Sequence, residues 1–243
     1  MRKQLLLAGL LLAVSINLSA QYKEFGFGMK MGPSLQWAGS KTNTVTNEST
    51  KMGFKWGFLA EYYFVENYAI VSGFNVNYIR GNYSFDDTRN ISIDTVSIPY
   101  EGNANRMFKG TYFEIPVLIK MRTEPFGPFN FFAEVGGSVG FCQKALAMDD
   151  FTTELGTSSD DDYASVAKQY NPIRANFIVL GGVEYVIKGS TRAFADLSYN
   201  RDLLNGMSYK YARKYLYADD AERVGDNLDL RENGFSLEVG VLF

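Results

Sequence analysis

The sequence contains no histidine and only one cysteine, Cys142. The lack of histidine removes the usual general base of hydrolases and the commonest metal ligand. A single cysteine cannot form an intramolecular disulfide, and with no histidine or motif beside it we expect an inert thiol. The net charge of −3 gives no electrostatic reason to bind nucleic acid. We therefore expect no enzymatic activity, no cofactor, no metal site and no nucleic-acid partner.

Long apolar runs are also scarce. After Gln21, no stretch approaches the roughly 18 apolar residues that a membrane helix needs. Residues 1–20 have the pattern of a signal peptide, with a basic start, an apolar run over 5–14 and small residues before the cut. We expect cleavage after Ala20, which leaves residues 21–243 as one domain. An uncleaved anchor is the alternative, and the shortness of the apolar run disfavours it.

Aromatic residues are plentiful, with 19 Phe and 16 Tyr, which suits β-strands and membrane interfaces. Eight segments alternate apolar and polar residues with the period of two that is typical of strands. They are residues 25–32, 54–64, 68–78, 113–122, 129–141, 173–185, 192–200 and 235–243.

The connections between these segments alternate in length. Short turns follow the second, fourth and sixth segments. Long polar stretches follow the first, third, fifth and seventh segments. The long stretches are residues 38–51, 81–106, 143–172 and 202–233. This pattern predicts an all-β fold, an eight-stranded antiparallel up-and-down transmembrane β-barrel with long extracellular loops and short periplasmic turns.

Alternation alone does not say which face points inward, but glycine and charge do. Eight glycines share the polar face, where they would make room for larger neighbours inside a narrow barrel. On a solvated outer face they would only weaken the strands. Charged residues of both signs share this face and can pair in the lumen. This predicted lumenal charge network is Lys30, Lys55, Glu61, Glu114, Lys120, Arg122, Glu134, Arg174, Glu184, Arg192, Asp196 and Glu238.

The apolar face is then expected to contact lipid, with aromatic girdles near its two ends. Candidates for these girdles are Trp37, Tyr68, Phe129 and Tyr185. Three positions break the alternation: Ser72 lies on an apolar face, and Phe132 and Phe194 lie on polar ones.

The final segment places five apolar residues on one parity and reaches Phe243. This strand resembles the last strand of bacterial outer-membrane β-barrel proteins, which the barrel-assembly machinery reads. The resemblance implies an address in the cell outer membrane, with outer-membrane lipid and lipopolysaccharide around the barrel and the assembly machinery as a partner. The implied assembly signal is Phe235, Leu237, Val239, Val241 and Phe243.

Three further segments resemble the PorT-like outer-membrane β-barrel family of Bacteroidetes. They are residues 57–62, residues 112–120 and residues 199–203, of which the second, with Tyr-x-Glu-Ile-Pro before aliphatic residues and lysine, is the most specific. The family takes its name from a member linked to type IX secretion. The resemblance implies the fold and the address, and it raises a role with secretion-machine or envelope proteins.

Three groups of side chains invite a chemical interpretation. Glu114, Glu134 and Glu184 could act as acid and base, but we favour a salt-bridge network because a filled lumen needs such pairs. Residues 160–162, with Asp149 and Asp150 upstream, could bind calcium, although a solvated acidic loop is the favoured interpretation. The stretch 209–217 interleaves tyrosines with bases, and contact with lipopolysaccharide or a partner and a ligand-free hairpin or short helix both stay open.

The sequence thus predicts a non-enzymatic integral outer-membrane barrel with a side-chain-filled lumen, which acts structurally or as a docking surface through its loops. An accessory component of a secretion or envelope-assembly machine is the alternative. A small porin is a weaker alternative, because eight strands leave no aqueous channel.

Overall fold

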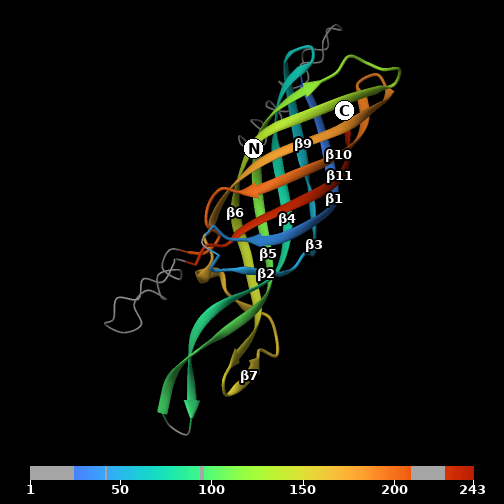
Figure 1. Ribbon diagram of the computed structural model, residues 1–243. Coiled ribbons are helices and arrows are strands. Elements are labelled where there is room, and N and C mark those ends of the chain that lie inside the picture. Colours follow the sequence, from blue (N-terminus) through green and yellow to red (C-terminus); the bar gives the residue numbers. More distant parts are fainter. Residues whose placement is uncertain (1–24, 42, 94–95, 209–227) are drawn as a thin grey trace, which may run out of the picture.

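The computed structural model describes residues 25–41, 43–93, 96–208 and 228–243, so the predicted signal peptide and the stretch 209–217 lie outside the described residues. Within that part of the chain, no helix is long and apolar enough to cross a membrane. Eight long strands dominate the structure (Figure 1). They are β1 (Phe25–Gly39), β3 (Lys51–Val65), β4 (Tyr68–Ile93), β5 (Val96–Arg122), β6 (Phe129–Thr153), β9 (Ile173–Lys188), β10 (Thr191–Asp202) and β11 (Arg231–Leu242).

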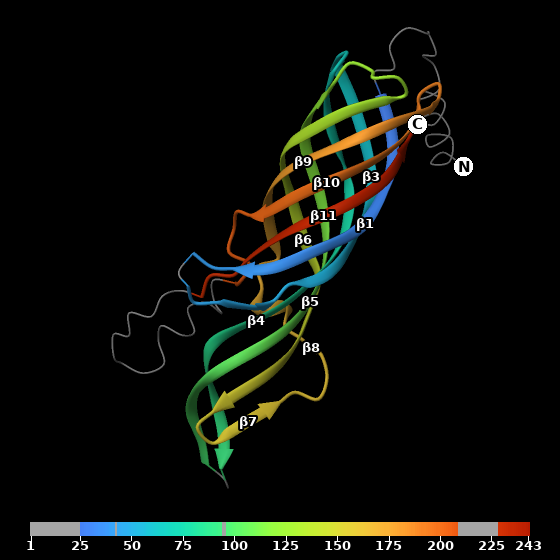
Figure 2. The same ribbon diagram turned by 45° about the vertical axis from the view of Figure 1, so that its right-hand side comes forward.

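The long strands close into a barrel. Each pairs antiparallel with the next along the chain, and β11 pairs back with β1, so that Met31 lies opposite Val239. The turns after β3, β5 and β9 are short and lie at the same end as Phe25 and Phe243 (Figures 1 and 2). Closure pairs both edges of every strand, which an open sheet cannot do. The predicted eight-stranded up-and-down antiparallel barrel is confirmed.

The polar face points inward, as the glycines and charges indicated. In β1, for example, Phe25, Phe27 and Met29 are exposed, whereas Gly26 and Gly28 are buried. The same alternation runs through the other long strands, and the exposed large apolar side chains lie almost entirely on their outer face. An apolar exterior around a largely polar interior is the arrangement of a membrane barrel rather than a soluble one.

Aromatic side chains mark the two ends of the apolar band. At the short-turn end, the ring centroids of Phe25 and Tyr62 are 4.9 Å apart. At the other end, Trp37 lies 5.6 Å from Phe235, which also contacts Tyr199 at 5.3 Å. The thirteen residues from Phe25 to Trp37 along β1 cover about 40 Å of strand, or about 30 Å along the axis at a typical tilt. This matches the hydrocarbon thickness of a bilayer.

Ser72 is the polar exception on the outer face, and a proline explains it. The β4–β5 ladder is interrupted between Ser72 and Asn75, opposite Pro116, which has no N–H to donate. The Ser72 hydroxyl donates to the Pro116 carbonyl oxygen at 2.8 Å. A hydroxyl that is satisfied in this way costs little on an apolar surface.

Two of the long polar stretches are not loops. β4, β5 and β6 continue well past the barrel as a twisted sheet, which we call the arm: residues 82–93, 96–109 and 144–153 of these strands (Figure 2). The short strands β2 (Thr46–Ser49), β7 (Gly156–Ser159) and β8 (Ala164–Ser165) pair along it. The prediction that residues 81–106 and much of 143–172 form loops is therefore wrong. Their polar composition hid one sparse apolar face, with Phe85, Ala104 and Phe151 buried on it.

The arm begins where the sheet leaves the barrel. The β5–β6 register shifts between Thr111 and Tyr112, and the pairing of β6 with β9 ends at Phe141. A β-bulge of this kind bends a strand and increases its twist. The bulge therefore directs β5 and β6 away from the closed ring and into the arm.

Candidate functional site in the barrel lumen

The twelve predicted lumenal charges all belong to the inward face. Ten of them are buried, and Lys30 and Arg122 are partly exposed. Charges removed from water in this way need partners at short range. They fall into three groups along the barrel, which we take from the short-turn end upward.

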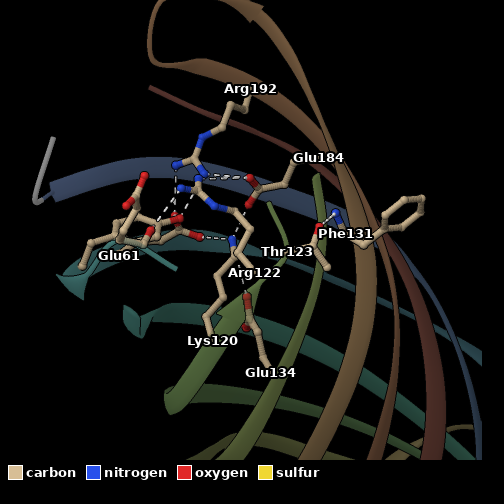
Figure 3. Close-up of polar contacts among 10 residues, drawn as sticks. Glu61, Lys120, Arg122, Thr123, Phe131, Glu134, Glu184 and Arg192 are labelled. Atoms are coloured by element: carbon tan, nitrogen blue, oxygen red, sulfur yellow. Dashed lines mark hydrogen bonds and ion pairs between the residues drawn. The ribbon is translucent and has the colours of Figure 1, made fainter. Parts of the chain in front are cut away.

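The first group, the Lys120 cluster, lies near the short turns and comprises Lys120, Glu61, Glu184, Arg192 and Arg122 (Figure 3). The Lys120 ammonium lies 2.5 Å from Glu61 Oε1 and also donates to Glu184 Oε1. Arg192 bonds the same two carboxylates, at 3.1 Å for Glu61 and 2.7 Å for Glu184. Two cations thus share two acids that come from opposite sides of the ring.

Tyr63 completes this cluster. Its hydroxyl donates to Glu61 Oε2 at 2.7 Å and accepts from Arg192 Nη1 at 2.9 Å. Sequence reasoning did not include it, although Tyr63 has the inward parity of Glu61 two residues earlier. Glu134 lies at the edge of the cluster, with one oxygen 3.9 Å from the Lys120 ammonium.

The second group is centred on Glu238. Its Oε2 lies 2.9 Å from the Lys30 ammonium, and its Oε1 lies 3.1 Å from the Lys55 ammonium. β1 pairs with both β11 and β3, so the acid and its two bases come from neighbouring strands. Asp196 lies opposite Glu238 on β10 and has no ion pair within 4.0 Å among the residues that the structure describes.

An apolar layer fills the lumen beside these charges, so the interior is not polar throughout. Phe132 and Phe194 meet edge to face there, with ring centroids 6.3 Å apart. A Cβ on Gly182 would lie 2.5 Å from the Phe132 ring, and one on Gly240 would lie 2.4 Å from the Phe194 ring. The two aromatic exceptions to the polar face therefore fit because glycine faces each of them. The layer is Leu59, Val71, Leu118, Phe132, Ile178, Leu180, Phe194 and Leu242.

The third group lies toward the long connections. The Arg174 guanidinium bonds Asp202 at 2.6 Å and Glu232 at 3.2 Å. Glu114 accepts from the Asn176 amide at 3.2 Å and has no ion pair within 4.0 Å in the described part of the chain. Sequence reasoning missed Asp202 and Glu232 because it ended the strands too early. Extending the inward parity of the last two strands would have found both.

An aromatic core lies above this group, at the end of the barrel from which the arm projects. Phe108 stacks on Tyr170 with ring centroids 4.4 Å apart, and the Tyr83 and Tyr170 hydroxyls are hydrogen-bonded to each other. Burial raises the pKa of both tyrosines, so they stay neutral at physiological pH. Met207 and Leu230, both in the connection between β10 and β11, pack into the same core.

One buried ion pair ties the arm together. Arg106 donates to both carboxylate oxygens of Asp149 at 2.7 Å, and its remaining Nη atom donates to Gln169 at 2.7 Å. Arg89 adds a bond of 2.5 Å to Asp149. Burial alone would raise the pKa of Asp149, but the hydrogen bonds and charge of Arg106, followed by those of Arg89, lower it overall.

The lumen has little room for a solute. The cavity bounded by Lys120, Glu134, Asp196 and the apolar layer is about 20 Å³, enough for a single water molecule. Among the described residues, no group of three His, Cys, Asp or Glu side chains could hold a metal ion, and the acidic run 160–162 is exposed. The paired charges can therefore stabilise a closed ring from inside.

The residues of the implied assembly signal lie on the outer face of β11 and at its end. Phe235, Leu237, Val239 and Phe243 are exposed, and Val241 is half-buried. They form part of the apolar band between β10 and β1.

Three solved structures are similar to this chain at low sequence identity. Neisserial surface protein A is 11% identical, with 90% of this chain and 96% of that chain covered and a TM-score of 0.39. Ail, the attachment invasion locus protein of Yersinia pestis, is 10% identical, with 91% and 100% covered and a TM-score of 0.37. The outer membrane protein OprG from Pseudomonas aeruginosa is 10% identical, with 91% and 97% covered and a TM-score of 0.36.

The family assignment comes from the sequence itself. No curated protein matches the chain. The family model of the outer membrane protein beta-barrel domain matches residues 15–205, which is most of this chain. The chain therefore belongs to the family of outer-membrane β-barrel domains, which places it in the outer membrane.

Proposed function

We propose that this protein is a non-enzymatic integral outer-membrane barrel whose filled lumen serves as a rigid base for the arm, and that the arm is its docking surface outside the cell. The signal peptide would be removed after Ala20. The observation that carries the proposal is the pairing of a tightly filled lumen with a long ordered sheet beyond the membrane band.

The filled lumen supports a structural role rather than transport. Lys120, Glu238 and Arg174 each centre a group of buried ion pairs, and the space left beside the first two is about 20 Å³. An eight-stranded barrel is just wide enough for its side chains to fill. The porin alternative would require these groups to separate, which would leave buried charges unpaired at a cost of several kcal/mol.

The arm supports the docking role. It continues three barrel strands directly, and the bond between Arg106 and Asp149 joins two of its own strands, so the arm is an ordered sheet rather than a loose loop. Exposed acids such as Asp86 and Glu101 give its surface the polar character of the rim of a protein interface. The same arm favours the alternative role, an accessory of a type IX-like secretion or envelope-assembly machine, to which the PorT-like resemblance points.

Planar-bilayer recordings test the filled lumen. The purified protein should show no steady conductance, because the side chains of the Lys120 cluster and the apolar layer fill the lumen. Large, stable, ion-selective current steps would overturn the proposal and promote the porin alternative. A known open porin inserted in the same bilayers is the positive control.

Cross-linking in native membranes tests the arm. The matched variant replaces residues 84–105 by a short Asn-Gly turn, which keeps the barrel part of β4 and β5. A partner that cross-links to the full protein and not to this variant would support docking through the arm. Identical cross-linked products from both proteins would overturn it and leave a purely structural role. A product that recurs as one stable complex would favour the accessory role.

A further inference from the structure

The short-turn end of the barrel contains a cleft of about 250 Å³, which is separate from the small cavity in the lumen. The volume is close to the lower end of the range for small-molecule sites, about 300–1,000 Å³. The cleft opens at the mouth between the β3–β4, β5–β6 and β9–β10 turns, and the Lys120 cluster forms its floor. Its wall includes apolar residues from four parts of the chain, Phe25, Pro125, Val186 and Phe243, of which Phe25 and Phe243 are about half exposed on the outer face.

Arg122 enters this cleft with most of its hydrogen-bonding capacity unused. Among the residues that the structure describes, its hydrogen bond runs from Nη2 to the Glu66 carbonyl oxygen, at 3.2 Å. Its nearest carboxylate oxygen, Glu184 Oε2, lies 3.8 Å away and already accepts from Arg192 at 2.7 Å. A guanidinium has five N–H donors in a fixed fork that matches a carboxylate. Arg122 is also the most exposed cation of the cluster, with a side chain 21% accessible.

Asn130 supplies the complementary group. The residue is buried, at 4% exposure, and its Oδ1 has no hydrogen-bond partner among the residues that the structure describes. A buried carbonyl oxygen without a donor is costly, and this one lines the cleft. Arg122 lies opposite Phe132 in the β5–β6 register, so Asn130 is its diagonal neighbour on the same face. Such neighbours have Cβ atoms about 7–8 Å apart, a span that one ligand residue can bridge.

From this geometry we propose that the cleft binds a small carboxylate that carries an adjacent N–H and an apolar side group, the chemistry of the C-terminal residue of a peptide. The Arg122 fork takes the carboxylate, the Asn130 oxygen accepts the N–H, and the apolar wall covers the side group. The exposed Glu66 at the rim disfavours ligands with more than one negative charge.

Titration by NMR of the ¹⁵N-labelled protein in nanodiscs tests the site, with N-acetyl-L-leucine as the probe. We expect saturable shifts of the Gly189 and Ser190 backbone amides, which line the cleft. The amide N-acetyl-L-leucinamide should bind about tenfold more weakly, because it cannot make the charge-assisted bond. It enters lipid at least as readily as the acid, so it also controls for partition into the disc.

Two variants assign the roles. Arg122→Gln should weaken N-acetyl-L-leucine about tenfold and remove the preference for acid over amide. Asn130→Ala should weaken N-acetyl-L-leucine but leave acetate, which has no N–H, unchanged. Arg201→Gln, at an exposed position far along β10, is the control and should change nothing.

Three results would overturn the proposal: no saturable shift at millimolar probe, equal affinity for acid and amide, or unchanged affinity in Arg122→Gln. Inorganic phosphate that binds as tightly as N-acetyl-L-leucine would replace the peptide terminus with a general anion site and would also overturn it. Unchanged spectra outside the cleft verify that each variant is folded.

Discussion

The Lys120 cluster and the Arg106–Asp149 pair are both buried and both held by short hydrogen bonds, but they connect different things. Lys120 on β5 reaches Glu61 on β3 and Glu184 on β9, strands that do not pair with β5. Arg106 and Asp149 lie directly opposite each other on the paired strands β5 and β6. The first set of bonds crosses the lumen and the second reinforces a ladder that backbone bonds already make.

This difference predicts where each set of charges matters. A cross-lumen bond joins strands that have no backbone contact, so its loss affects the shape of the whole ring. A cross-strand bond in the arm acts beyond the closed ring, so its loss is felt locally. Similar substitutions in the two regions should therefore differ in how much stability is lost and in which part of the molecule loses it.

The largest effect is expected for Lys120→Met. The substitution leaves Glu61 and Glu184 with one cation fewer in a buried site, at a cost of about 3–5 kcal/mol. Urea unfolding in micelles measures the change in the free energy of unfolding. Lys188→Met, at an exposed position, is the matched control and should stay within about 0.5 kcal/mol. Equal unfolding midpoints for the two variants would show that cross-lumen pairing does not hold the ring.

A smaller effect is expected for Gly182→Ala, which tests the apolar layer of the same lumen. The added Cβ would lie 2.5 Å from both the Phe132 ring and the Ala195 carbonyl oxygen, and such overpacking costs about 1–3 kcal/mol. The adjacent Gly181→Ala is the control, because its Cβ would meet nothing closer than 3.8 Å. If both alanine variants were as stable as the unmutated protein, the close approach of Phe132 would not constrain the lumen.

The smallest effect on barrel stability is expected for Asp149→Asn. The barrel should lose less than about 0.5 kcal/mol, because the pair lies outside the ring. Hydrogen exchange should instead rise over the arm strands, where Arg106 loses its charged partner. A fall in the urea midpoint as large as that of Lys120→Met would show that arm and barrel unfold together.

Acid should reproduce this local effect. The folded-state pKa of Asp149 is lowered, so its stabilising contribution is complete above the unfolded value of about 3.9 and is lost as pH falls through the lower folded value. Amide hydrogen exchange in the arm should therefore rise below about pH 4, and this rise should be smaller in Asp149→Asn. An identical pH response in the two proteins would contradict this role of Asp149.

Most of the barrel could be read from alternation. All eight alternating segments lie in strands of the structure, apart from Phe243 at the end of the last one, and the side with the glycines and charges faces the lumen. Period two is a property of each strand by itself, so no tertiary information is needed to see it. Phe132 and Phe194 broke the pattern because they pack above glycines on other strands, which alternation along one strand cannot reveal.

The arm was missed for a different reason. Residues 81–106 are polar and show no obvious apolar face in the sequence, so they resembled a loop. Phe85, Ala104 and Phe151 become one buried face only when β4, β5 and β6 lie side by side. Long-range pairing thus outweighed local composition.

By itself, the sequence determined the number of barrel strands, their order along the chain and the face that each turns to the lumen, because each of these follows from a local period. Tertiary structure alone decided which charges meet, how far β4, β5 and β6 continue as the arm, and where Arg122 and Asn130 share a cleft. These depend on distances across a closed ring, between residues far apart in the chain, and ring closure sets those distances.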